Sequence, residues 1–212
     1  MKTVNVTYTV YDFSELSNNA KDKVKAWYLS RFDRNEEFSD RCEEELSLHF
    51  PKSDLKSQYS LAYCQGDGVN IYGTLNLKDV LYDSSVSSLT SFKPEETFTE
   101  KEKEVLSCYA RECGWEITLP CNNRYGYCMA DRIDFAEEWE YILTEIAKPC
   151  EKVDRVLIRR FEKYIIDLFT GLCAELESAG YHFLYTIADS SMESVCDAYD
   201  WMFLENGTLF SV

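Results

Sequence analysis

Hydrophobic and polar residues alternate through the first eleven positions of the chain. One face of an extended segment carries Val4, Val6, Tyr8 and Val10, and the opposite face carries Asn5, Thr7 and Thr9. A period of two residues predicts a half-buried strand over residues 2–11.

From Asp12 onward the period changes to that of a helix. Either Asp12 or Ser14 can cap it, and Glu15 falls early in the first turn, where a carboxylate is favourable. The predicted helix continues to about Phe32. Its apolar positions keep helical spacing and are Leu16, Ala20, Val24, Trp27 and Tyr28.

A second helix is predicted from about Asn35 to Phe50, where Pro51 ends it. Its apolar residues recur every four positions at Phe38, Cys42 and Leu46. Two strand-like runs follow at 57–64 and 69–77, joined by Gln65-Gly66-Asp67-Gly68. An Asp-Gly pair between two such runs indicates a hairpin, because glycine accepts the positive φ of a tight turn.

The rest of the chain is predicted to alternate between helices and short strands. We expect a short helix and then a loop over 79–98, a helix from Glu100 to Cys113, and a strand pair formed by 115–119 and 127–135. A helix from Ala136 to Ala147 is expected to end before Pro149, and a long helix after it to stop at Gly180. A last strand over 181–187 and a last helix over 190–200 complete the predicted elements. Strand pairs with short turns favour an α+β fold, with an antiparallel sheet packed against several helices. No linker or repeat divides the sequence, so a single domain over 1–212 is expected.

Composition supports a folded, reduced protein. Hydrophobic residues make up 45% of the 212 positions and aromatic residues 15%, which is too much for a disordered chain. The nine cysteines are odd in number and scattered from Cys42 to Cys196, and the first ten residues lack the apolar core of a signal peptide. No run approaches the roughly 18 apolar residues that span a bilayer. We therefore expect a soluble protein of the cytoplasm.

Charge is the most unusual property of the sequence. The 38 acidic residues outweigh the 22 basic ones by 16, and three stretches (36–45, 131–145 and 186–212) each carry a net charge of −5. Such a chain repels nucleic acids and anionic membranes and favours a basic partner, although an acidic surface also serves solubility alone.

Helical projection places these acids opposite the apolar residues of three predicted helices. Solvated helix faces account for any one of them, but three faces with little interleaved lysine favour binding to a basic surface by imitation of phosphates. The turn residue Asp67 is a further candidate contact. The predicted partner-binding residues are Glu36, Glu37, Asp40, Glu43, Glu44, Asp67, Glu137, Glu138, Glu140, Glu193, Asp197 and Asp200.

No motif predicts catalysis, a cofactor or a metal. The two histidines, His49 and His182, lie near no recognisable nucleophile motif, and there is no phosphate-binding loop. The spacing of Cys121 and Cys128 is too wide for a paired zinc site, and one carboxylate at Asp67 cannot hold calcium. We predict a binding protein rather than an enzyme.

Three segments carry a resemblance to a known family. Phe13-Ser14-Glu15-Leu16-Ser17 with Ala20-Lys21 matches a "FxELSxxAKxxA" helix, the run from Cys64 to Gly73 matches a "SQGDGxxFxG" hairpin, and Phe203 through Gly207 matches an "xxFxxxG" tail. In these segments the chain resembles a family of small proteins carried by bacteriophages and other mobile elements. It departs from the family pattern at Cys64, where serine is usual, at Ile71, near an expected aromatic residue, and at Tyr199-Asp200-Trp201 in the tail.

The resemblance implies a phage accessory protein, and such genes often encode inhibitors of host defence. Combined with the acidic faces, it leads to the hypothesis of an anti-CRISPR protein that occupies the basic nucleic-acid channel of an effector nuclease. One alternative is an antitoxin-like or regulatory protein that docks through an apolar patch including Trp201 or Phe203. Another is a small enzyme or nucleotide-binding protein that uses the hairpin at Gln65–Gly68.

Overall fold

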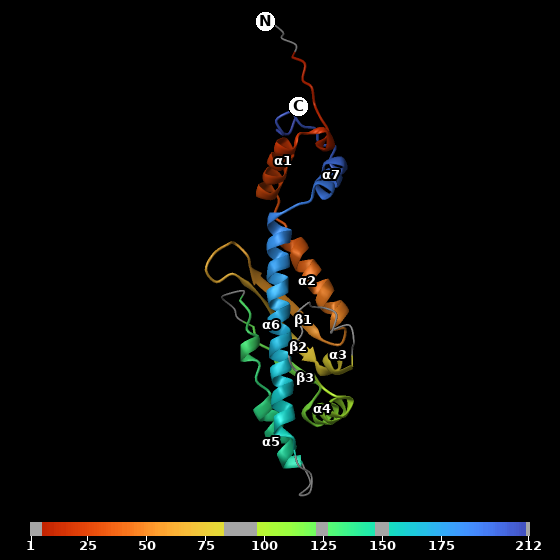
Figure 1. The fold of residues 1–212 in the computed structure, drawn as a ribbon, viewed down its shortest axis with the longest axis vertical. Coiled ribbons are helices and arrows are strands. Elements are labelled where there is room, and N and C mark those ends of the chain that lie inside the picture. Colours follow the sequence, from red (N-terminus) through yellow and green to blue (C-terminus); the bar gives the residue numbers. More distant parts are fainter. Residues whose placement is uncertain (1–5, 83–96, 122–126, 147–152, 211–212) are drawn as a thin grey trace. The chain divides into compact units, whose positions relative to one another are not determined.

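The computed structural model describes residues 6–82, 97–121, 127–146 and 153–210. Contacts group the chain into two compact units (Figure 1). Unit 1 comprises Met1–Glu36 and Tyr181–Val212, and unit 2 comprises Glu37–Gly180. The predicted α+β class is confirmed. The expectation of a single domain stays a prediction.

Unit 2 contains a three-stranded antiparallel sheet. Its strands are β1 (Asp54–Ser60), β2 (Gly68–Asn76) and β3 (Glu116–Leu119), in the spatial order β1-β2-β3. Ser60 of β1 pairs with Gly68 of β2, which confirms the predicted hairpin. β1 begins and ends earlier than expected, so the connecting loop covers residues 61–67.

Helices cover this sheet and supply most of the core of unit 2. They are α2 (Asn35–His49), α3 (Leu77–Tyr82), α4 (Glu100–Cys113), α5 (Ala136–Ile146) and α6 (Arg155–Tyr185). α6 runs along the sheet (Figure 1), and its buried Phe161 and Ile165 share one apolar cluster with Leu75 of β2. α2, α4 and α5 confirm the predicted helices to within a residue or two.

The predicted end of the long helix at Gly180 is wrong. α6 continues through Gly180 to Tyr185, which also replaces the strand expected over 181–187. A Cβ atom on Gly180 would lie 2.7 Å from the Phe38 ring and closer still to Leu61. The glycine is therefore required for close packing of α6 on its neighbours, and not for termination of the helix.

The predicted pairing of residues 115–119 with 127–135 is also wrong. β3 pairs with β2 instead, and residues 127–135 contain a 3₁₀ turn at Ala130–Arg132; residues 122–126 lie outside the described part. The buried side chain of Asn70 explains the arrangement. It donates to the Pro120 carbonyl at 3.0 Å and accepts from the Met129 N–H at 2.9 Å, so both segments are held to β2.

Unit 1 is built from a 3₁₀ turn (Phe13–Glu15), α1 (Asn18–Arg31) and α7 (Asp189–Ala198). Its core includes Phe13, Val24, Met192 and the fully buried Phe203. Glu15 accepts from the Asp12 N–H at 3.0 Å, so the predicted cap closes the short turn, and Ser17 caps α1.

The predicted N-terminal strand is wrong in its described part. Residues 6–10 form no strand, and Val6 and Tyr8 are 63% and 57% exposed; residues 1–5 lie outside the described part. Only an isolated bridge joins Tyr11 to Phe203. Alternation alone does not form a strand where no neighbouring strand supplies hydrogen bonds along its length.

None of the helices in the described part of the chain combines the length and apolar character needed to cross a membrane.

Candidate functional site

α2 separates an apolar side from an acidic side, as its sequence pattern predicts. Phe38, Cys42 and Leu46 are buried, and the Phe38 ring packs edge-on against Tyr59 of β1 with centroids 5.0 Å apart. Asp40, Glu43 and Glu44 are exposed. The buried side fixes the orientation of the helix, so the carboxylates opposite are held on a rigid element.

The acidic side of α2 surrounds a shallow depression of about 580 Å³. Its lining consists of Asp40, Glu43, Glu44, Ser47 and Leu48. Leu48 is 69% exposed, so an apolar side chain lies among the carboxylates. We call Asp40, Glu43 and Glu44 the α2 acidic face.

The helix dipole favours two of the other acids of α2, but not this face. Glu36 and Glu37 lie in the first turn, where the helix dipole favours negative charge, and Glu37 contacts Arg41 at 3.4 Å. The α2 acidic face lies beyond that turn, and Asp40 and Glu44 are four residues apart, a spacing at which like charges repel. Its charge therefore disfavours the helix that carries it.

The acids of α5 have clear structural roles. Glu137 and Glu138 occupy its first turn, where they complement the helix dipole. Glu140 is largely buried and contacts Arg159 at 2.8 Å and Arg155 at 3.8 Å. This contact raises the pKa of the Arg159 guanidinium above its usual value. In unit 2, α2 and α5 lie towards opposite ends of α6 (Figure 1), so their acids do not form one surface.

The acids of α7 differ from one end of the helix to the other. Asp189, in the first turn, contacts Lys25 at 2.8 Å, and this hydrogen bond lowers the pKa of the carboxyl. Glu193, Asp197 and Asp200 are exposed. Asp197 lies in the last turn and Asp200 just beyond it, where the helix dipole disfavours negative charge.

Asp67 organises the hairpin loop of unit 2. Its carboxylate accepts hydrogen bonds from the Ser60 hydroxyl, the Ala62 and Cys64 backbone N–H groups and the Cys64 thiol. This side chain, like that of Glu140, is already engaged in contacts that stabilise the fold.

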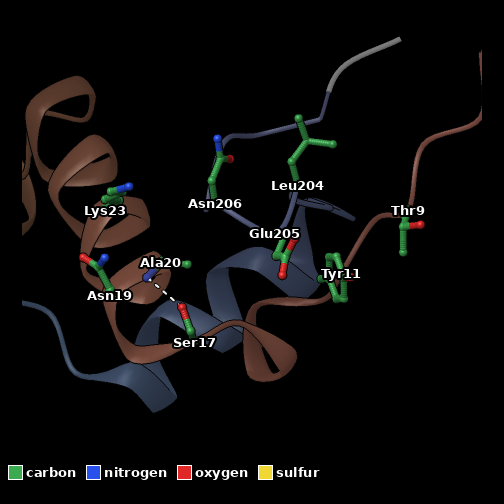
Figure 2. Close-up of a pocket in the computed structure, with 9 residues that line it drawn as sticks. All are labelled: Thr9, Tyr11, Ser17, Asn19, Ala20, Lys23, Leu204, Glu205 and Asn206. Carbon is green, nitrogen blue, oxygen red and sulfur yellow. Dashed lines mark hydrogen bonds between the residues drawn. The ribbon is translucent and has the colours of Figure 1, made fainter.

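A polar pocket of about 640 Å³ lies within unit 1 (Figure 2). It is lined by Thr9, Tyr11, Ser17, Asn19, Ala20, Lys23, Leu204, Glu205 and Asn206. The Ser17 hydroxyl accepts from the Ala20 N–H at 3.3 Å. Ser17 therefore acts as a helix cap. Among the lining residues, no base contacts its hydroxyl in a way that would make it a nucleophile.

Sequence reasoning missed a pair of thiols in unit 2. The Cys173 thiol on α6 donates to the Cys128 sulfur, and this contact lowers the pKa of the Cys128 thiol and raises the pKa of the Cys173 thiol. Nothing in the spacing of these two cysteines signals the contact. The cysteines of the described ranges are free thiols, and among the described residues no group of three His, Cys, Asp or Glu side chains is arranged to hold a metal.

No family model, curated protein or solved structure matches this chain. The resemblance to the phage family therefore stays a prediction. Phe203, one of the two aromatic residues considered for apolar docking, is fully buried and is unsuited to that role.

Proposed function

We propose that the protein is a phage-encoded anti-defence inhibitor of the anti-CRISPR type that acts in the bacterial cytoplasm. Its α2 acidic face binds a basic, nucleic-acid-binding surface of an effector nuclease and excludes the nucleic acid. The protein acts by binding, without a cofactor, and makes no direct contact with nucleic acid.

The carrying observation is that Asp40, Glu43 and Glu44 are exposed around a depression on a helix whose other side is buried. Side chains three and four residues apart on a helix lie about 5–6 Å from one another. The carboxylates therefore form a compact array of negative charge. These carboxylates repel each other in the free protein. A bound cationic partner reduces this repulsion, which the fold itself leaves in place.

The chemistry of the partner follows from this array. A channel that binds a nucleic-acid backbone is lined by lysine and arginine, and a carboxylate array can occupy the same positions as phosphates. Association should be accelerated by electrostatic steering and weakened by salt. The exposed Leu48, which lines the same depression, adds an apolar contact beside the face.

Competition with nucleic acid tests the proposal. The binding of a fluorescent target DNA to a panel of purified RNA-guided effector nucleases is measured by anisotropy as the full-length protein is added. We expect displacement from at least one effector. Replacement of Glu43 and Glu44 by lysine should weaken that displacement about a hundredfold or more, since each reversal places like charges in contact.

A matched pair of variants controls for net charge. Glu137→Lys with Glu138→Lys changes the total charge by the same amount on α5 and should weaken displacement by less than about fivefold. Asp197→Lys with Asp200→Lys tests α7 in the same way. If none of the three pairs weakens displacement, or if the α5 pair weakens it as much as the α2 pair, imitation of phosphates by α2 is wrong.

A further inference from the structure

Five aromatic side chains gather on unit 1 in a partly exposed cluster. They come from the C-terminal half of α1, the residue that caps it and the chain after α7, and are Trp27, Tyr28, Phe32, Tyr199 and Trp201. We call them the aromatic patch. The Trp201 ring lies 5.2 Å from Trp27, 5.7 Å from Phe32 and 5.0 Å from Tyr199, measured between centroids. Tyr199 is 64% exposed and Phe32 40%. Exposed aromatic clusters of this kind are typical of binding surfaces.

The end of α7 holds two of these rings together. The backbone N–H of Trp201 donates to the Cys196 carbonyl at 2.9 Å, and the backbone N–H of Asp200 donates to the Asp197 carbonyl at 3.3 Å. This is the hydrogen-bond pattern of a Schellman C-cap, in which glycine usually occupies the left-handed position. Here Asp200 occupies it, with φ 51°. The Tyr199 and Trp201 rings on either side of it are stacked, with an interplanar angle of 20°.

Two exposed acidic residues lie close to Tyr199 and Trp201 along the chain, at a helix end that disfavours negative charge. The last turn of α7 contains Asp197 and no basic residue, and Asp200 follows the capping residue Tyr199. The helix dipole adds further negative potential at the C-terminus of α7. Residues 186–210 contain five acidic residues and no lysine or arginine. The faces of the aromatic rings, the carboxylates and the helix end therefore all attract a cation.

We propose that the aromatic patch, together with Asp197 and Asp200, binds an arginine side chain on an exposed basic segment of a partner protein. A guanidinium group is planar and weakly hydrated, so it can stack on an aromatic ring while its N–H groups donate to carboxylates. Unit 1 already contains one stacked guanidinium, which donates to backbone carbonyls in place of carboxylates. The Arg34 guanidinium lies 3.9 Å from the centroid of the Phe183 ring and donates to the Phe183 carbonyl.

The position of the cation follows from the neighbouring charges. Arg31 lies one residue before Phe32 and is exposed in the last turn of α1, so it repels a cation at that edge of the patch. The partner's arginine therefore binds beside Tyr199 and Asp200. This surface belongs to unit 1 and shares no residue with the α2 acidic face, so the inference goes beyond the proposed function and either can fail alone.

Nuclear magnetic resonance of the full-length protein tests the inference through its four tryptophans. Each indole N–H gives one signal, assigned by single replacement with phenylalanine. The probe is an acetylated, amidated arginine–glycine repeat peptide, at about 0.15 M salt, where the Debye length is about 8 Å. The signals of Trp27 and Trp201 should shift, and those of Trp115 and Trp139 in unit 2 should not. A glutamine–glycine peptide should shift none of them.

Variants distinguish binding at a specific surface from a general effect of the protein's net charge. Asp197→Asn with Asp200→Gly removes two carboxylates while keeping a residue suited to the left-handed position, and should weaken peptide binding about tenfold. Tyr199→Leu should weaken it about threefold. Glu137→Gln with Glu138→Gln removes the same charge elsewhere and should change it by less than about twofold.

The unshifted Trp115 and Trp139 signals report whether unit 2 of each variant is folded, and the dispersion of the Trp27 signal reports on unit 1. If the arginine peptide moves neither Trp27 nor Trp201, or if the two charge-removing pairs weaken binding equally, no arginine-binding surface exists here. Equal binding of the glutamine peptide would also overturn it.

Discussion

The stretches 36–45 and 131–145, which contain most of α2 and α5, have equal net charge, yet the acids of the two helices have different roles in the structure. On α5, Glu137 and Glu138 complement the helix dipole and Glu140 holds two arginines of α6. On α2, the acidic face lies beyond the first turn, where the dipole gives no support, and its members repel one another. Acidic residues can thus stabilise one helix and destabilise another, and only the destabilising arrangement indicates a partner.

The largest effect is expected from a variant that disrupts the packing of α6 against Phe38, on the buried side of α2. Gly180→Leu places a side chain where Phe38 and Leu61 leave no room, so we expect a loss of about 3 kcal/mol in the free energy of unfolding of unit 2. Chemical denaturation followed by tryptophan fluorescence measures it. The control Ser178→Leu adds the same side chain at an exposed position of α6 and should change stability by less than about 0.5 kcal/mol. Equal losses would show that Gly180 does not set this packing.

A smaller effect should have opposite signs on the two helices. Glu140→Gln removes a largely buried partner of Arg159, and we expect it to destabilise the protein by about 1 kcal/mol. Glu43→Gln with Glu44→Gln removes repulsion within α2 and should leave stability unchanged or raise it by a few tenths of a kcal/mol. Both are measured by thermal denaturation at low salt. Destabilisation by the α2 pair would mean that those carboxylates serve the fold.

The smallest effect concerns the response to acid. The backbone N–H of Thr99, the Arg160 guanidinium and the Thr99 hydroxyl hold the pKa of Glu102 at about 2, below its usual 4.5. Because the pKa is lowered in the folded state, the stabilisation is complete above about pH 4.5 and is lost as the pH falls towards 2. Glu102→Gln should therefore lower the melting temperature at pH 6 more than at pH 3. An equal change at both pH values for Glu102→Gln would contradict this role.

Much of the fold follows from local pattern. The periods of apolar residues predict α2, α4 and α5 to within a residue or two, and the Asp-Gly turn predicts the β1–β2 hairpin. The failures come from contacts distant in sequence. Gly180 signals a helix end in the sequence, but the approach of Phe38 and Leu61 determines its use. Likewise, β3 pairs with β2 rather than with residues 127–135, because Asn70 of β2 holds both segments through its side chain.

The candidate surfaces were predicted only in part. Helical projection correctly separates the buried and exposed sides of α2, because the pattern is local. It does not show that Asp67 and Glu140 are engaged within the protein, because their partners lie in other elements or in the folded loop. Nor does it show that α1 and the chain after α7 bring five aromatic rings together.

The salt dependence of binding tests the central claim most directly. The dissociation constant of the complex with an inhibited effector is measured over a range of salt for the natural protein, for Glu43→Gln with Glu44→Gln, and for Glu137→Gln with Glu138→Gln. Our account predicts a clearly shallower dependence on salt for the α2 pair and an unchanged dependence for the α5 pair. Equal slopes for all three proteins would show that the carboxylates of α2 do not meet the charges of the partner.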